Sequence, residues 1–211
     1  MLKRFLNILL VIFFLPARLL ASYEIVEPQD TPHAFMAQLL LNTSGHPDLI
    51  AFCYNYSCKR QTLIHINSEQ SKAFKALFTH HTHTPKSERQ VISQDVARYE
   101  QIAAMQAPVA DEKGKNHNDR PPGRLDCIDE ASNTTRFLHY LENLDILRWH
   151  RVEKPVYRAP WLFGLLGQHW SAHILDTENT PHYAVDSWVR DNGQPPPIQP
   201  REAWKKREPY E

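Results

Sequence analysis

The sequence is poor in glycine and cysteine and carries no net charge. It has six glycines against sixteen prolines, three cysteines, and 24 basic residues balanced by 24 acidic ones. A neutral balance offers no electrostatic basis for binding nucleic acid or an acidic membrane, so we expect neither partner. Sixteen prolines favour loops and extended connections over a long helical bundle. The 211 residues suffice for one domain of ordinary size with its own core.

The chain also lacks an apolar run long enough to cross a bilayer. Its longest, Phe5 to Leu15, falls short of the roughly 20 residues that a spanning helix needs. A basic start before this run and small residues ending at Ala21 are typical of a secretory signal. We therefore expect residues 1–22 to be a signal peptide, with no membrane span after its removal. Residues 23–211 would form a single exported domain, periplasmic or secreted; retention of the segment as an anchor is the lesser alternative.

Three cysteines cannot all pair within one chain. Cys53 and Cys58 are close enough in sequence to form a disulfide around a small loop, which leaves Cys127 over. A left-over thiol in an exported protein is either a reactive group or an intermolecular link. The alternative that all three are reduced and Cys127 is core material stays open. We expect no metal and no cofactor, because the cysteine pair has no second pair to complete a zinc site.

The residues around Cys127 predict a helix that begins at this cysteine. Pro121, Pro122 and Gly123 block a helix upstream, and Asp126 is a good N-cap, with Asp129 at the capping-box position. Apolar residues then recur at helical spacing as far as Leu144. The exposed N–H groups of a first helical turn favour a thiolate, although the neighbouring acids oppose it. A histidine would therefore have to supply much of the activation.

Other segments have simpler patterns. Residues 49–52 and 62–66 are expected to form a hairpin, and Ser68 is expected to cap a helix. Residues 85–107 predict a long amphipathic helix that begins at a proline. The tract His80–His83 could bind a metal, but a solvated loop is the simpler interpretation because no acid or cysteine flanks it.

Two late strands, residues 170–176 and 182–188, are expected to pair across a turn at residues 179–180. If the hairpin closes symmetrically there, opposed residue numbers sum to 359, and His173 faces Asp186 on one side of the sheet. A carboxylate so placed would fix the tautomer of the imidazole and stabilise its cation. A slip in register would separate this pair. His169 and His182 are competing bases, and Asp176 is a competing orienting acid.

A cysteine at a helix start, then a histidine on one strand and an aspartate on the next within Tyr183–Trp188, resembles the transglutaminase-like superfamily. In particular it resembles the bacterial transglutaminase-like cysteine proteinases of the wider papain-like group, over about residues 120 to 190. The resemblance implies an α+β fold in which the cysteine helix packs on an antiparallel sheet. It also implies Cys127 as nucleophile, His173 as base and Asp186 as orienting carboxylate.

The function expected from these features is that of an exported thiol acyl-transfer enzyme acting on a peptide or protein. It would hydrolyse a peptide or amide bond through the thiol, imidazole and carboxylate. The sequence leaves open whether water or an amine resolves the thioester. Two alternatives remain: an inactive transglutaminase-like module with a binding or scaffolding role in the cell envelope, and an interaction protein linked through Cys127.

Overall fold

The computed structural model describes residues 46–117, 122–159 and 168–210. The expected signal peptide therefore lies outside the described residues. The elements follow the chain as β1 (Leu49–Tyr54), β2 (Arg60–His65), α2 (Ser68–His81), α3 (Pro85–Ala104), α4 (Cys127–Asn143), β3 (His150–Arg158), β4 (His169–Asp176), β5 (His182–Val185), the 3₁₀ turn η1 (Ser187–Val189), β6 (Ile198–Pro200) and α5 (Arg201–Lys205). No helix in these described ranges is both long and apolar enough to span a bilayer.

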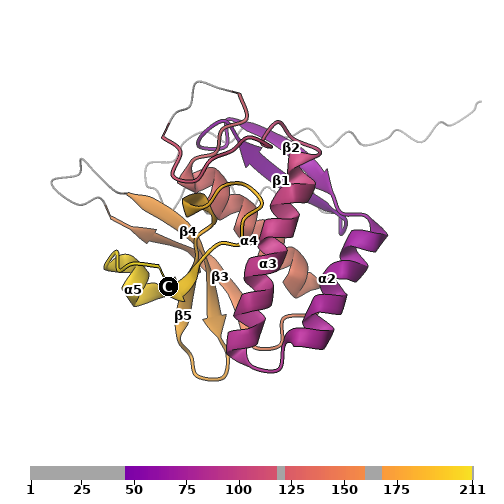
Figure 1. Cartoon of the computed structure of the whole chain (residues 1–211), viewed down its shortest axis with the longest axis vertical. Helices are drawn as coiled ribbons and strands as arrows, with labels where there is room; N and C mark the ends of the chain where they lie inside the picture. The colour runs from indigo at the N-terminus through magenta and orange to yellow at the C-terminus, as the bar shows by residue number, and fades with distance from the viewer. Residues whose placement is uncertain (1–45, 118–121, 160–167, 211) are drawn as a thin grey trace, which may run out of the picture.

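Helix α4 is the central element, with sheet on either side of it. The β1–β2 hairpin forms one antiparallel sheet, and β3, β4, β5 and β6 form a second one in that order. Helix α4 contacts β1 as well as β3 and β4, and α3 packs beside it (Figure 1). Mixed helices and antiparallel sheets confirm the expected α+β class.

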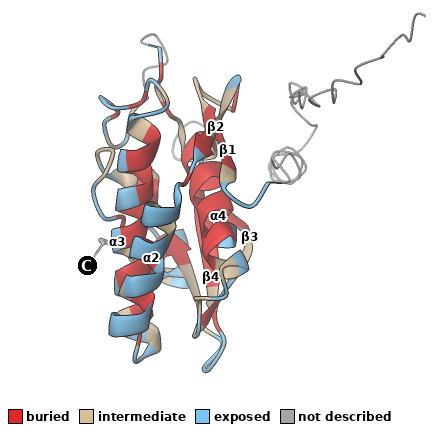
Figure 2. Cartoon of the chain, turned by 90° about the vertical axis from the view of Figure 1, so that its right-hand side faces the viewer, coloured by how far each residue is buried: buried red, intermediate tan, exposed pale blue. Residues whose placement is uncertain are grey.

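Burial follows this arrangement closely. Every residue of α4 from Asp129 to Leu141 except His139 is buried, whereas α2 and α3 turn exposed faces outward (Figure 2). The core joining these helices is aromatic: the rings of Tyr99 and Phe137 stack with centroids 4.5 Å apart. A helix covered on nearly all sides holds its first residue in a fixed place, and that residue is Cys127.

Local signals set most helix boundaries. The predicted β1–β2 hairpin is present, and α3 begins at the predicted proline with Thr84 as its N-cap. The cap of α2 is Asn67 rather than Ser68, because the Asn67 side chain accepts from the Gln70 N–H. Helix α3 ends at Ala104, three residues earlier than expected.

The predicted register of β4 and β5 is wrong by two residues. His173 lies opposite Ala184 and Leu175 opposite His182, so opposed numbers sum to 357 rather than 359. The physical cause lies in the connection: the Asp176 carboxylate accepts the N–H groups of Glu178 and Asn179. This side-chain turn lengthens the reversal, because such Asx-turns substitute for backbone hydrogen bonds. Strand β5 ends at Val185, so Asp186 does not face His173.

The second sheet is covered on both faces. Trp170, Ala172 and Ile174 point toward the α4 side, where Trp170 packs on Ala131. On the other face the fully buried indole of Trp204, from α5, packs against Val156 and Ala184. Trp204 thus docks α5 on this face of the sheet. His169, the first residue of β4, also contacts this indole, with ring centroids 5.5 Å apart.

Candidate active site

Cys127 occupies the predicted position at the first residue of α4. Asp126 caps the helix by accepting the N–H groups of Ile128 and Asp129, and Asp129 returns a bond to the Asp126 N–H, so the predicted capping box is confirmed. The half-buried thiol packs beside Trp170 and accepts a hydrogen bond from its backbone N–H. The Cys127 thiol therefore lies against the start of β4.

The surroundings of Cys127 oppose ionisation of the thiol. Burial raises its pKa to about 12, and the charges of Asp126, Asp186 and Asp129 act in the same direction. The Trp170 N–H lowers the pKa but does not compensate for burial. At neutral pH the sulfur is therefore protonated, and a nucleophilic role requires a base that removes the proton during attack.

The predicted disulfide between Cys53 and Cys58 is present and closes a loop beside the start of α4. The four residues Asn55 to Cys58 all have positive φ, between 53° and 67°. A left-handed turn of non-glycine residues costs roughly 1–2 kcal/mol per residue, so it persists only where its surroundings enforce it. Covalent closure by the disulfide is one such constraint. Asn133, whose side chain bonds both the N–H and the carbonyl of Cys53, is another.

This left-handed turn binds the acids on either side of Cys127. The N–H groups of Tyr56 and Cys58 donate to the Asp129 carboxylate, and the Ser57 N–H and hydroxyl donate to Asp126. Burial still raises the pKa of both carboxyl groups, and their mutual repulsion adds to the shift at Asp129. The turn thus fixes the helix start by satisfying carboxylates that would otherwise be buried without donors.

Within the described ranges, one group of His, Cys, Asp and Glu side chains has ligand atoms close enough together to hold a metal: Cys53, Cys58 and Asp129. Both sulfurs are used by the disulfide, and a metal ligand must be a thiolate. The Asp129 oxygens are already bonded to backbone N–H groups. This group therefore links the disulfide loop to α4 and is not a metal centre.

The histidine bound to Asp186 is His169, at the first residue of β4. Its Nε2 lies 2.8 Å from both carboxylate oxygens of Asp186, and both side chains are almost fully buried. A carboxylate only accepts, so Nε2 carries the proton. Nδ1 is buried and has no hydrogen-bond partner among the residues that the structure describes. One nitrogen is thus oriented by an acid while the other is left available.

Asp186 is held ionised by its donors. Burial acts to raise the pKa of this carboxyl group, but the hydrogen bond and charge of His169, together with bonds from Tyr210 and Trp204, bring it below its ordinary value. The Tyr210 hydroxyl lies 2.5 Å and the Trp204 Nε1 2.7 Å from Oδ2. A buried carboxylate with three donors is a stable partner for an imidazolium.

The segment after Asp186 is bound to the first half of α4. Ser187 donates to the Glu130 carboxyl oxygen at 2.8 Å, and its hydroxyl lies 2.9 Å from that of Thr134. Burial raises the pKa of Glu130 to about 8, so this acid is protonated at neutral pH. These contacts join the residue after Asp186 to α4, and the charge of Asp186 acts on Cys127 at the start of that helix.

His173, the base expected from the sequence, lies elsewhere. It is four residues along β4 from His169, which corresponds to about 13 Å of strand. Its Nδ1 donates to the Lys154 carbonyl at 3.1 Å, and its Nε2 lies 3.0 Å from His182 Nδ1. Burial lowers the pKa of His173 to about 4, and the charges of His182 and Arg201 act in the same direction. Both nitrogens are occupied, and the predicted bond to Asp186 is absent.

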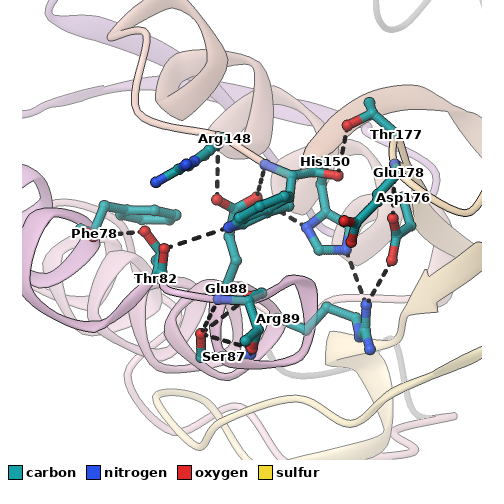
Figure 3. A network of polar contacts seen from close by, with 12 residues as sticks. Phe78, Thr82, Ser87, Glu88, Arg89, Arg148, His150, Asp176, Thr177 and Glu178 are labelled. Atoms are coloured by element: carbon teal, nitrogen blue, oxygen red, sulfur yellow. Dashed lines mark hydrogen bonds and ion pairs between the residues drawn. The ribbon is translucent and has the colours of Figure 1, made fainter.

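A second histidine–carboxylate pair lies at the opposite end of β4 (Figure 3). His150 Nδ1 donates to Glu88 at 2.9 Å, and Arg89 donates to His150 Nε2 at 3.1 Å and to Asp176 at 3.3 Å. The backbone N–H groups of residues 148 and 149 also bind Glu88. Both imidazole nitrogens are used, so this network fastens the start of β3 to α3 and is closed to a substrate.

The sequence predicts Cys127 and Asp186 as site residues and offers His169 only as a competing base. The contact between His169 and Asp186 cannot be predicted from strand pairing, because Asp186 lies beyond the end of β5 and has no partner in the ladder. The donors Trp204 and Tyr210 were missed as site residues, since nothing in the pattern connects the C-terminal residues to Asp186. Comparison with family models, with curated proteins and with solved structures finds no match for this chain.

Proposed function

We propose that this protein is an exported thiol acyl-transfer enzyme that hydrolyses peptide or amide bonds. Cys127 is the nucleophile, His169 the general base and acid, and Asp186 the carboxylate that orients the imidazole. The observation that carries the proposal is the state of His169: Nε2 is bound to a buried carboxylate, and the buried Nδ1 has no partner within the described ranges. A buried, unused nitrogen is costly for stability, which argues for a role in chemistry.

The proposed reaction follows from these groups. As the Cys127 sulfur attacks the carbonyl carbon, His169 Nδ1 takes the thiol proton, and Asp186 stabilises the imidazolium. Nδ1 then returns the proton to the leaving amine, and the C–N bond breaks to leave a thioester. Water, deprotonated by the same nitrogen, attacks the thioester and releases the acid and the thiol. The Cys127 N–H, which has no intrahelical partner at a helix start, suits the role of oxyanion donor.

The arrangement of elements supports this proposal. A cysteine at the start of a core helix, a histidine on an adjacent antiparallel strand and an aspartate after the next strand follow the order of transglutaminase-like cysteine proteinases. If the chain is such an enzyme, the α4–β3–β4–β5 unit is its papain-like core, and His169 takes the role that the sequence suggested for His173. The Cys53–Cys58 disulfide suits an oxidising compartment, as expected for an exported protein.

A second function, a non-catalytic binding or scaffolding module of the cell envelope, is favoured by one observation. The thiol pKa near 12 makes Cys127 a poor nucleophile unless His169 acts on it. In such a module the same residues would serve packing alone. The two functions differ in whether the reactivity of Cys127 depends on His169.

The test is covalent labelling with a peptidyl acyloxymethyl ketone, a thiol-directed acyl probe. The enzyme proposal predicts rapid labelling of the folded wild type, none in Cys127→Ala, and a loss of about a hundredfold or more in His169→Ala, the range of general base catalysis. His173→Ala is the matched control and should label like the wild type. Labelling of the wild type no faster than that of urea-unfolded protein would contradict the enzyme and favour the binding module.

A further inference from the structure

The end of the chain reaches into the proposed site. Residues 201–210, named here the C-terminal segment, comprise α5 and the residues after it. Two of its side chains end on one oxygen of Asp186: Trp204 Nε1 at 2.7 Å and the Tyr210 hydroxyl at 2.5 Å. The indole is fully buried and Tyr210 is half-buried. Asp186 therefore has as many donors from the C-terminal segment as a carboxylate oxygen readily accepts.

Separate contacts hold the C-terminal segment in this position. Arg158 on β3 donates to the Trp204 carbonyl at 2.9 Å, and its guanidinium carbon lies 4.7 Å from the centre of the indole. Gln199 donates to the carbonyls of Glu208 and Pro209. The phenol of Tyr210 is thus delivered to Asp186 by a seated backbone, as a preorganised site requires.

The His169 ring is also confined between two indoles. Its centroid lies 4.7 Å from that of Trp188 and 5.5 Å from that of Trp204. Rings on two sides restrict rotation of the imidazole and keep water from the bond to Asp186. Trp204 therefore acts on both members of the pair, by donation to the acid and by contact with the base.

We propose that Trp204 and Tyr210 are positioning residues, which hold the Asp186 carboxylate and through it set the orientation and the basicity of His169. This inference rests on the proposed function, since it assigns the C-terminal segment to that same site. The electrostatic argument is direct: each donor takes up part of the negative charge on Oδ2, so less of it acts on the imidazole N–H. Removal of a donor leaves Asp186 a stronger partner for the imidazolium, and His169 then holds its proton to a higher pH.

Among the described residues, other ionisable groups act near the His169–Asp186 pair, and the variants below leave them unchanged. They are Arg158 on β3, and Cys127 and Glu130 on α4, both of which interact with the charge of Asp186. The critical variant is Tyr210→Phe, which removes one hydroxyl and keeps the ring. The matched control is Tyr99→Phe, the same chemical change in the core contact between α3 and α4.

The experiment is the pH dependence of labelling by the acyloxymethyl ketone. In Tyr210→Phe the midpoint of the acid limb should move up by about one pH unit, so labelling below the midpoint falls about tenfold while the plateau changes less than about twofold. Trp204→Phe should move the midpoint in the same direction, and Tyr99→Phe should leave it in place. A uniform loss at every pH, or an unmoved midpoint in the folded Tyr210→Phe protein, would overturn the inference.

A second readout separates this inference from the proposed function. The His169 imidazole is titrated by NMR in wild type and in Tyr210→Phe, which needs no catalysis. An upward shift of the His169 pKa in Tyr210→Phe supports the positioning role. It does so even if the wild type fails to label, because that failure rejects only the proposed enzymatic function. An unchanged His169 titration rejects positioning even if the wild type labels rapidly.

Discussion

Two histidine–carboxylate pairs lie beside opposite ends of β4, in two different states. At the first residue His169 is bound to the buried Asp186, and near the last residue His150 is bound to the buried Glu88. The distances are nearly equal, 2.8 Å and 2.9 Å. The difference is in the second nitrogen: Arg89 occupies Nε2 of His150, whereas Nδ1 of His169 has no partner in the described part of the chain.

A histidine–carboxylate pair is therefore not by itself a sign of chemistry. The closed pair joins α3 to the sheet and satisfies every polar atom of the imidazole, as a structural network should. The open pair carries an unsatisfied nitrogen at the end of the strand that contacts Cys127. The unfilled hydrogen bond, and not the pair, distinguishes a candidate site from a structural joint.

The largest expected effect concerns Glu130, the protonated acid beside Asp186. Its folded pKa of about 8 lies above the ordinary 4.5, so folding favours its protonated form. Stability is therefore lost as pH rises from 4.5 to about 8, by roughly 1.4 kcal/mol per pH unit, or about 5 kcal/mol in all. Urea unfolding at several pH values should show this slope in wild type and a flatter one in Glu130→Gln. Equal slopes in the two proteins would contradict it.

The next effect compares the two pairs directly. His150→Ala removes one hydrogen bond each from Glu88 and Arg89, which keep only the N–H groups of residues 148 and 149 and the Asp176 carboxylate. His169→Ala removes one from Asp186 but also removes a nitrogen that was already unsatisfied. A buried unsatisfied group costs roughly 1–3 kcal/mol, so His150→Ala should be the less stable variant by about 2 kcal/mol. Calorimetry should find its melting temperature lower by about 4–8 °C. A lower melting temperature for His169→Ala would remove the distinction between the open and the closed pair.

The smallest effect concerns the middle of β4, where His173 is bonded to His182. The pKa of His173, lowered to about 4, means that folding favours the neutral ring. Stability is complete above the ordinary value of 6.5 and falls as pH drops toward 4. We expect His173→Asn to reduce this loss by roughly 1 kcal/mol, a figure lowered for partial exposure to water. Unfolding midpoints at pH 7 and pH 5 measure it, and an equal difference in both proteins would contradict it.

Local chemistry made part of this structure predictable. Asp126 before an amphipathic run fixed the start of α4, the sequence separation of Cys53 and Cys58 allowed their disulfide, and a proline marked the start of α3. Each depends on a few residues adjacent in sequence, where capping and short-loop closure act. The placement of Cys127 at a helix start follows from the same signals.

The histidine that we propose as the base could not be chosen in this way. The choice between His169 and His173 depended on the register of a hairpin, and the Asp176 side-chain turn shifted that register by two residues. Asp186 lies beyond the end of β5, so strand pairing does not place it. The contact of Tyr210 with Asp186 spans 24 residues and has no periodicity to reveal it. Such contacts arise from tertiary packing, which local propensity does not contain.

The most direct test of the central claim is the rate of Cys127 alkylation by iodoacetamide at pH 7 in His169→Ala and in His173→Ala. If His169 is the base, its removal slows the reaction about a hundredfold, while His173→Ala stays within about twofold of wild type. Equal rates in wild type and His169→Ala, or a larger loss in His173→Ala, would contradict the assignment of His169 as the base.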